Sequence, residues 1–342
     1  MSRLQFLYPG WWAVVMGLAG LTLAWHRAHD MLGEWAQAAS LALAILTAVA
    51  FIVLALASFV RFVRHLEAWR EDARHPVRHV FLAAIPISML LAVTVAVALD
   101  GPSAWAAALW WAGSIVQLAV TVWVLGRWWR GNTPANPEQG VPPGLAWPGV
   151  TPALFIPVVG NVVVPLAGVP LGFPEWSAAQ FGVGLFFWPV ALVLVILRGA
   201  IAGPLPDRLL PTAFITVAPP AVIGLSLAQF GAPPLVLWTM WGIALFSLLW
   251  AGTLAKRIAA LPFAMPHWAL SFPLAAFAAL TLRVAPTSGA GSVLALAALA
   301  LASLIIAGLV LATLRGLAQG TLLVAEAHPA VPSAANPELA RS

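Results

Sequence analysis

Residues 209–234 read LLPTAFITVAPPAVIGLSLAQFGAPP, within a stretch that has no charged residue between Arg208 and Lys256. A helix needs about 20 mostly apolar residues to cross a bilayer, so this stretch is too long for one crossing. The Gly231-Ala-Pro-Pro234 sequence is typical of a turn. It divides the stretch into two predicted spans, Pro211–Phe230 and Leu235–Leu254. The first of them carries a proline pair, Pro219-Pro220, in its interior.

The composition of the whole chain indicates a membrane protein. Of 342 residues, 62% are hydrophobic and 8% are charged, whereas a soluble domain has about 25% charged residues. Such a chain cannot cover its surface with polar groups, so its solvent must be the bilayer. Backbone groups in hydrocarbon must bond internally, and the period-two alternation of a barrel is missing. We therefore expect an all-α integral membrane protein. The basic residues form no compact patch, so nucleic acid is not an expected partner.

Charged residues and histidines mark the ends of ten predicted spans. Of the 16 Lys and Arg residues, all but Arg27 and Arg283 fall in the termini or the even-numbered loops. Positive residues favour the cytoplasmic side, so we expect both termini to be cytoplasmic, and one missed helix would destroy the asymmetry. The spans are Pro9–Trp25, Ala36–Val60, Val80–Leu99, Ala104–Leu125, Thr151–Val169, Ala178–Leu197, Pro211–Phe230, Leu235–Leu254, Ala264–Leu282 and Gly291–Leu314.

The spans form one predicted unit. We expect a single ten-helix transmembrane channel domain at residues 1–324 and a short disordered cytoplasmic tail at residues 325–342, which is polar and contains proline. The segment 131–148 is rich in Pro, Gly and Asn and predicts a cytoplasmic loop.

Prolines recur in the odd-numbered spans. A proline within a helix frees a backbone carbonyl, which must then find water or protein. We therefore interpret the spans as five helical hairpins, with five inner Pro-kinked helices around a central pore and five outer helices facing lipid. For any single proline, the general frequency of proline in membrane helices is the preferred explanation, and only the recurrence in alternate spans favours the pore. The inner prolines are Pro9, Pro86, Pro157, Pro219 with Pro220, and Pro273, and Pro189 in the sixth span is the exception.

The predicted pore contains no acidic group. All 11 acidic residues fall at span ends, in loops or in the tail, so the spans offer no proton relay or cation site. Asn161 has two equally weighted interpretations: it lines the pore, or it bonds a carbonyl freed by Pro157 or a neighbouring helix. The hydroxyl and amide groups expected beside an otherwise apolar lining are those of Thr151, Asn161, Thr212, Thr216 and Ser271.

Five segments carry a resemblance to a known family. They are Pro9–Trp25 (PGWWAVVMGLAGLTLAW), His75–Arg78 (HPVR), Phe155–Gly160 (FIPVVG), 204–221 (PLPDRLLPTAFITVAPPA) and Trp268–Leu274 (WALSFPL). In this order they resemble the tellurite-resistance/dicarboxylate-transporter family, which includes bacterial TehA and the plant guard-cell slow anion channels. The resemblance extends from about Pro9 to Leu314, nearly the whole chain.

The resemblance implies a homotrimer in a bacterial inner (plasma) membrane, with a separate pore in each protomer. It also implies that a phenylalanine directly before the ninth-helix proline closes the pore, and here that residue is Phe272. Ordinary helix packing is the alternative role for this ring. TehA has glycine and proline where this chain has Ala13 and Val15, so a bulkier first helix could narrow the pore. The candidate pore-lining or kink residues are Pro86, Pro157, Pro219, Pro220, Pro273, Ala13, Gly17, Gly160 and Asn161.

Two classes of transport function stay open on these residues. The first is a gated passive channel for small inorganic or organic anions. The second is a carrier, such as a proton-coupled C4-dicarboxylate carrier or a tellurite- or sulfite-type oxyanion carrier, although the spans offer no titratable group for coupling. A scaffold without transport is a further alternative. We expect no enzyme activity and no metal or cofactor, because the histidines and the single lysine, Lys256, lie at span ends, in loops or in the tail.

Overall fold

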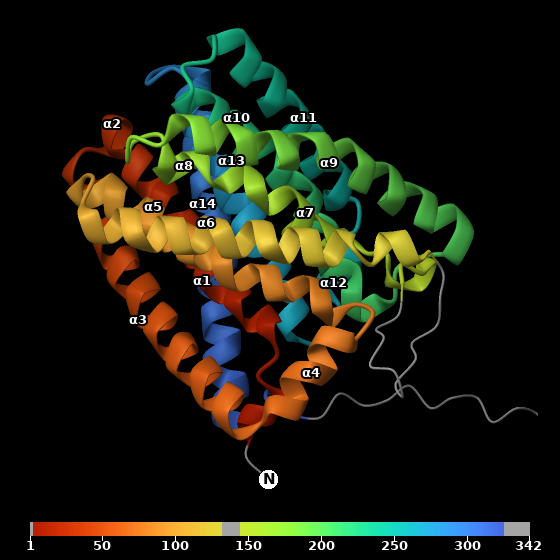
Figure 1. The fold of residues 1–342 in the computed structure, drawn as a ribbon. Coiled ribbons are helices and arrows are strands. Elements are labelled where there is room, and N and C mark those ends of the chain that lie inside the picture. Colours follow the sequence, from red (N-terminus) through yellow and green to blue (C-terminus); the bar gives the residue numbers. More distant parts are fainter. Residues whose placement is uncertain (1–2, 132–143, 325–342) are drawn as a thin grey trace, which may run out of the picture.

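The computed structural model describes residues 3–131 and 144–324, and every regular element within these ranges is helical (Figure 1). Eight helical segments of the described residues are long and apolar enough to cross a membrane. This confirms the all-α membrane class. The segments are α3 (Glu34–Arg64), η3 with α5 (Arg78–Ala83, Ala84–Asp100), α6 with η4 (Ala104–Leu125, Trp128–Arg130), α9 (Pro174–Ala202), η8 with α10 (Asp207–Val217, Ala218–Gln229), α11 (Pro234–Gly252), η9 with α13 (Met265–Leu270, Ser271–Val284) and α14 (Ala290–Gln319).

The other two predicted spans, the first and the fifth, are not among these eight segments. The first consists of the 3-10 turn η2 (Pro9–Trp12) and α1 (Ala13–Arg27). The fifth is broken into four pieces and is not the single helix we expected. These pieces are η6 (Pro152–Leu154), α7 (Phe155–Val159), η7 (Gly160–Val163) and α8 (Pro165–Gly168). The count of ten crossings therefore stays a prediction. The predicted tail, and most of the predicted loop at 131–148, lie outside the described residues.

Burial separates the odd segments from the even ones. In the most apolar parts of segments 78–100, 207–229 and 265–284, between 61% and 83% of the residues are buried. The corresponding share in the five even segments is between 11% and 33%. Pro189, the exception to the proline pattern, is exposed on the outer helix α9. The odd segments are thus the inner ones, as the recurring prolines predicted.

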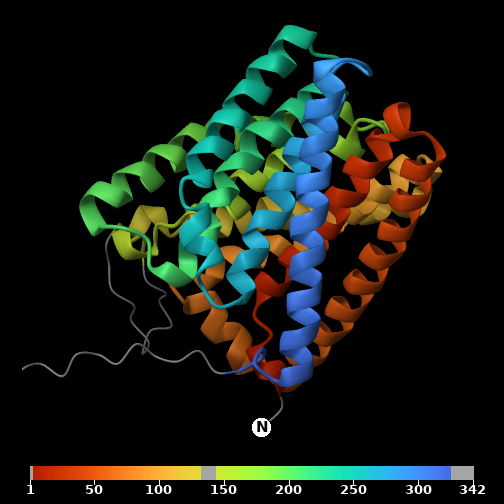
Figure 2. The same ribbon diagram turned by 180° about the vertical axis from the view of Figure 1, so that it is seen from behind.

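The inner segments form a closed ring, and each has an outer partner. Helix α1 contacts α5, α5 contacts α8, α8 contacts α10, α10 contacts α13, and α13 returns to α1. The outer helices complete five hairpins, which pair α3 with α1, α6 with α5, α9 with α7, α11 with α10 and α14 with α13. Figures 1 and 2 show the long outer helices α3, α9 and α14 around the shorter inner elements. We call the face where the inner segments begin the proximal face, and the face where they end the distal face.

Apart from Pro9, which begins the 3-10 turn η2, the inner prolines mark junctions between 3-10 and α-helix and do not kink continuous α-helices. Pro86 is the third residue of α5, after η3. Pro219 and Pro220 are the second and third residues of α10, and Pro273 is the third residue of α13, after η8 and η9 respectively. The first N–H groups of an α-helix have no partner within the helix, so proline is tolerated there. Pro157 occupies the same third position in α7.

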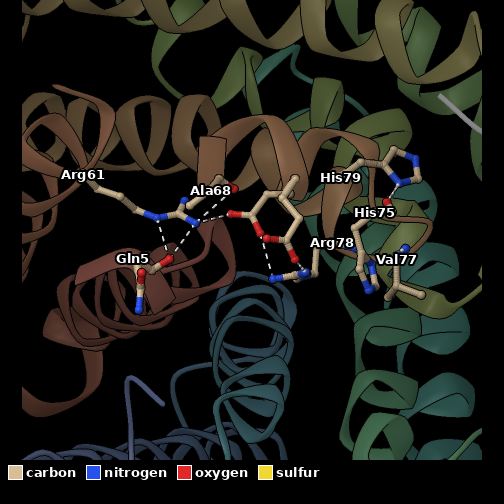
Figure 3. A network of polar contacts seen from close by, with 9 residues as sticks. Gln5, Arg61, Ala68, His75, Val77, Arg78 and His79 are labelled. Carbon is tan, nitrogen blue, oxygen red and sulfur yellow. Dashed lines mark hydrogen bonds and ion pairs between the residues drawn. The ribbon is translucent and has the colours of Figure 1, made fainter. Parts of the chain in front are cut away.

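A buried ionic cluster holds the proximal ends of α3 and η3 together through the unpredicted helix α4 (Leu66–Arg74) (Figure 3). Asp72 of α4 lies 2.7 Å from Arg61 and 3.0 Å from Arg78, and the Arg61 and Asp72 side chains are buried. Burial raises the pKa of the Asp72 carboxyl above its ordinary value, against the pull of the two arginines. Arg61 also donates to the Gln5 carbonyl at 3.0 Å, so the cluster joins the N-terminal segment to α3.

The HPVR sequence is the turn that starts the third segment. The Nδ1 atom of His75 accepts hydrogen bonds from the backbone N–H groups of Val77 and Arg78, at 3.1 and 3.0 Å. The His75 carbonyl contacts the Nδ1 atom of His79 at 2.9 Å. This turn directs Arg78 toward Glu71 and Asp72. The motif therefore has a structural role at the proximal face.

Asp72→Asn is expected to destabilise the fold by about 3 kcal/mol, because it leaves the buried Arg61 guanidinium without a counter-charge. Thermal unfolding in detergent would measure the loss. The matched control is Glu71→Gln, which removes a partner of Arg78 that is 68% exposed, and whose loss should cost about 1 kcal/mol or less. Equal stability of the two variants would contradict the assignment.

Candidate functional site along the axis of the bundle

Three cavities follow one another along the ring axis. The proximal cavity, of about 80 Å³, is lined by residues of all five inner segments, among them Ala13, Ile87, Gly160, Val222 and Phe272. The middle cavity, of about 30 Å³, is lined by residues that include Gly20, Leu91, Val222 and Phe272. The distal cavity, of about 510 Å³, includes the exposed residues His29 and Asp30.

Phe272 and Val222 line both the proximal and the middle cavity, so they form the constriction between them. Phe272 is the second residue of α13 and is 9% exposed. Its ring packs toward Gly20 of α1, where an added Cβ would come within 3.1 Å of the Phe272 Cδ2 atom. Pro273 follows it and lines the proximal cavity. A large apolar ring at such a point excludes water and raises the barrier to an ion.

The predicted site residues divide into two groups. Phe272, Pro219, Pro273, Ala13 and Gly160 line the proximal cavity. The other five do not line any of these three cavities, namely Gly17, Pro86, Pro157, Pro220 and Asn161.

Gly17 lies where α1 and α13 approach each other. A Cβ at Gly17 would fall 2.3 Å from the Oγ atom of Ser271 and 2.5 Å from its Cβ atom, distances that real Cβ atoms essentially never show. The glycine therefore permits close packing directly beside the constriction, because Ser271 precedes Phe272 in the sequence. The hydroxyl of Ser271 donates to the Trp268 carbonyl at 2.6 Å.

Asn161 lies in a polar network between α6, η7 and α9. Its side chain is fully buried and donates to Thr121 at 2.9 Å and to the Val158 carbonyl at 3.2 Å. Its Oδ1 atom accepts from Gln180 at 2.9 Å. Of the interpretations that the sequence left open, these contacts match the bond to neighbouring helices. The carbonyl that Asn161 bonds is that of Val158, and not that of Ala153, four residues before Pro157.

Side chains of neighbouring helices bond the carbonyls of the broken fifth segment. A carbonyl left free in hydrocarbon is costly, so it must be paired. Here the partners are protein groups. The Pro157 carbonyl accepts from Gln117 and Thr121, that of Val162 from Ser226, and that of Val164 from Trp110. Hydroxyls that we expected beside the pore also bond backbone carbonyls: Thr212 that of Leu209, and Thr216 that of Ala213.

The only charged side chain among the described residues that line the proximal and middle cavities is positive. Among the described residues, no carboxylate lines the proximal or the middle cavity, and Arg27 lines the middle one. Sequence reasoning did not assign Gly20, Val222, Thr94, Gln229 or Arg27 to the path. Arg27 carried a signal, because it is one of two basic residues that break the charge asymmetry. The other four have no such signal, since apolar and small polar residues occur throughout the spans.

The chain is similar to proteins from archaea and plants. An uncharacterized transporter of Methanocaldococcus jannaschii, MJ0576, is 24% identical over 298 residues, which cover 79% of this chain and 81% of that protein. A second, MJ0762, is 29% identical over 156 residues, covering 39% and 45%. The S-type anion channel SLAH2 of Arabidopsis thaliana is 26% identical over 226 residues, covering 64% and 40%. The chain thus spans less than half the length of two of these relatives.

A family model described as voltage-dependent anion channel matches residues 7–314. The matched range contains the five inner segments, their outer partners except for the last turn of α14, and the residues that line the axial cavities. The chain therefore belongs to the voltage-dependent anion channel (SLAC1) family.

Proposed function

We propose that this chain is a gated channel through which small anions pass down their gradient, and that Phe272 is the gate. Membership of the family supports membrane anion transport in general. The observation that carries the finer proposal is that Phe272 and Val222 separate two axial cavities of which neither is lined by a carboxylate in the described part of the chain. In these two cavities an anion meets no carboxylate of the described residues, and the ring is the main obstacle.

The working protein in this proposal is a homotrimer in a bacterial inner membrane, with both termini cytoplasmic and one pore in each protomer. The charge asymmetry of the sequence supports the orientation. The long outer helices expose large apolar side chains such as Ile45, Phe186 and Leu304, a surface that suits lipid or a neighbouring protomer. The resemblance to TehA and the plant slow anion channels supports the trimer.

A proton-coupled carrier for C4-dicarboxylates, or for tellurite- or sulfite-type oxyanions, is the second candidate. Coupling requires a group that changes its protonation along the path. Among the described residues, the histidines and the carboxylate that line the path, His26, His29 and Asp30, all lie in the distal cavity, beyond the constriction. Their position gives the carrier less support than the channel, because a coupling group should lie at the substrate site.

Reversal potentials in liposomes should distinguish the two. Under a chloride gradient without a pH gradient, we expect the reversal potential of the purified protein to follow the chloride equilibrium potential. Adding a pH gradient of one unit should leave it unchanged, because a channel does not couple anions to protons. Liposomes without protein are the control for leak. A pH-dependent shift would contradict the channel and support the carrier, and cation selectivity would contradict both.

A further inference from the structure

Two basic residues are exceptions to the preference of Lys and Arg for the termini and the even-numbered loops, and both lie at the distal face. Arg27 is the last residue of α1, and Arg283 lies in the last turn of α13. Helices α1 and α13 are neighbours in the inner ring. Arg27 lines both the middle and the distal cavity, whereas Arg283 is exposed and lines neither. Topology alone would not put an arginine at this place on the axial path.

The middle and distal cavities share a small set of lining residues, and two of these have unused N–H donors. The Thr94 hydroxyl already donates to the Leu90 carbonyl at 2.8 Å. Among the described residues, the Arg27 guanidinium and the Gln229 amide make no hydrogen bond or ion pair with protein. Both side chains are partly buried. The shared set is Leu23, Arg27, Thr94, Leu166 and Gln229, and we call it the distal constriction.

An anion at the distal constriction would meet an unfavourable backbone field without a cation there. The inner helices end at the distal face, and a helix C-terminus carries a partial negative charge of about half an elementary charge. Arginine keeps its positive charge at any physiological pH. The nearest carboxylate on the path, that of Asp30, lines only the wide distal cavity, together with His26 and His29. Arg27 is thus the cation placed to offset the helix ends at the narrow point.

We propose that Arg27 and Gln229 bind a small inorganic anion at the distal constriction and so set the anion concentration next to Phe272. This inference rests on the proposed channel function. The guanidinium supplies charge and directed N–H groups, and the amide supplies a neutral donor, which together suit a partly dehydrated halide-sized anion. Chloride is the probe with which we test the site.

The first test measures conductance in the Phe272→Ala background, in planar bilayers at varied chloride. Arg27→Gln should lower the conductance at about 0.1 M chloride on the order of tenfold, because one unit charge is lost close to the anion. The difference in conductance between Arg27→Gln and its parent should shrink at about 1 M salt, because the charge of Arg27 is then screened within about 3 Å. Arg27→Lys should keep most of the conductance, and Gln229→Leu should fall between the two. The matched control is Arg64→Gln, which removes an exposed arginine at the end of α3.

The second test measures binding without conduction, on otherwise wild-type protein. Replacing gluconate by chloride at constant ionic strength should raise the melting temperature, because a ligand that binds only the folded state stabilises it. Arg27→Gln should lose this rise and Arg64→Gln should keep it. An equal rise in all three proteins would overturn the site, even if the channel function holds. If Phe272→Ala conducts no anions while the chloride-dependent rise needs Arg27, then the proposed function fails and the binding site stands.

Discussion

Phe272→Ala is expected to raise the anion conductance of the protein far more than any other single change along the axis. The ring lies between the proximal and the middle cavity, and removing it joins them. If the ring adds as little as about 2.7 kcal/mol to the barrier, its loss gives a rise of about 100-fold. The measurement is single-channel or macroscopic current in planar bilayers, with the wild type, for which we expect a small basal conductance, as the reference.

The matched control for the gate is Phe277→Ala. Phe277 is also a buried phenylalanine of α13, but it packs on Trp241 and lines none of the three axial cavities. Both variants should destabilise the fold by about 3 to 5 kcal/mol, the usual cost of truncating a buried phenylalanine. Only the Phe272 variant should gain conductance. A similar gain in both variants would show that loosened packing opens the protein, and no gain in either would refute the gate.

The alternation of inner and outer segments could be predicted from the sequence because two independent signals agreed. Charged residues mark the ends of the spans. The preference of Lys and Arg for the cytoplasmic side then tests whether the number of spans is right. A proline has no backbone N–H group, so one helix carbonyl is left without its usual partner. An unpaired carbonyl costs free energy in a bilayer and must be paired inside the protein. Together these place Pro86, Pro219 and Pro273 in the inner ring, where the structure has them.

The local form of the inner segments could not be predicted. A proline such as Pro273 shows that one hydrogen bond is absent, but not whether the preceding turn is α or 3-10. The fifth segment can be broken because Gln117, Thr121 and Ser226 supply side-chain partners for its carbonyls, and these partners come from distant parts of the chain. Arg27 was visible as an exception in the charge asymmetry, yet only the cavities show that it lies on the axial path.

Gly17→Ala is the second change with a large expected effect. The new methyl group would overlap Ser271, whose Cβ and Oγ atoms lie 2.5 and 2.3 Å from its position. Rotation of the Ser271 hydroxyl can relieve the contact with Oγ but not the one with Cβ, which is fixed to the backbone, so α1 and α13 must separate. We expect a loss of about 1 to 3 kcal/mol of stability, as for other overpacked cores. The ring of Phe272 next to Ser271 should also lose its packing on Gly20, which should raise the basal conductance.

A size exchange separates this clash from other effects of the substitution. In Gly17→Ala/Ser271→Gly the methyl group moves from one helix to the other, so stability and low basal conductance should largely return. Ser271→Gly alone measures the loss of the hydrogen bond to the Trp268 carbonyl. Gly182→Ala in the outer helix α9, where a Cβ meets nothing within 4 Å, is the control and should be neutral or slightly stabilising. If the double variant is no more stable than Gly17→Ala, then the two helices are not in the contact that seats Phe272. Contact between α1 and α13 would then not be what holds the Phe272 ring in the pore.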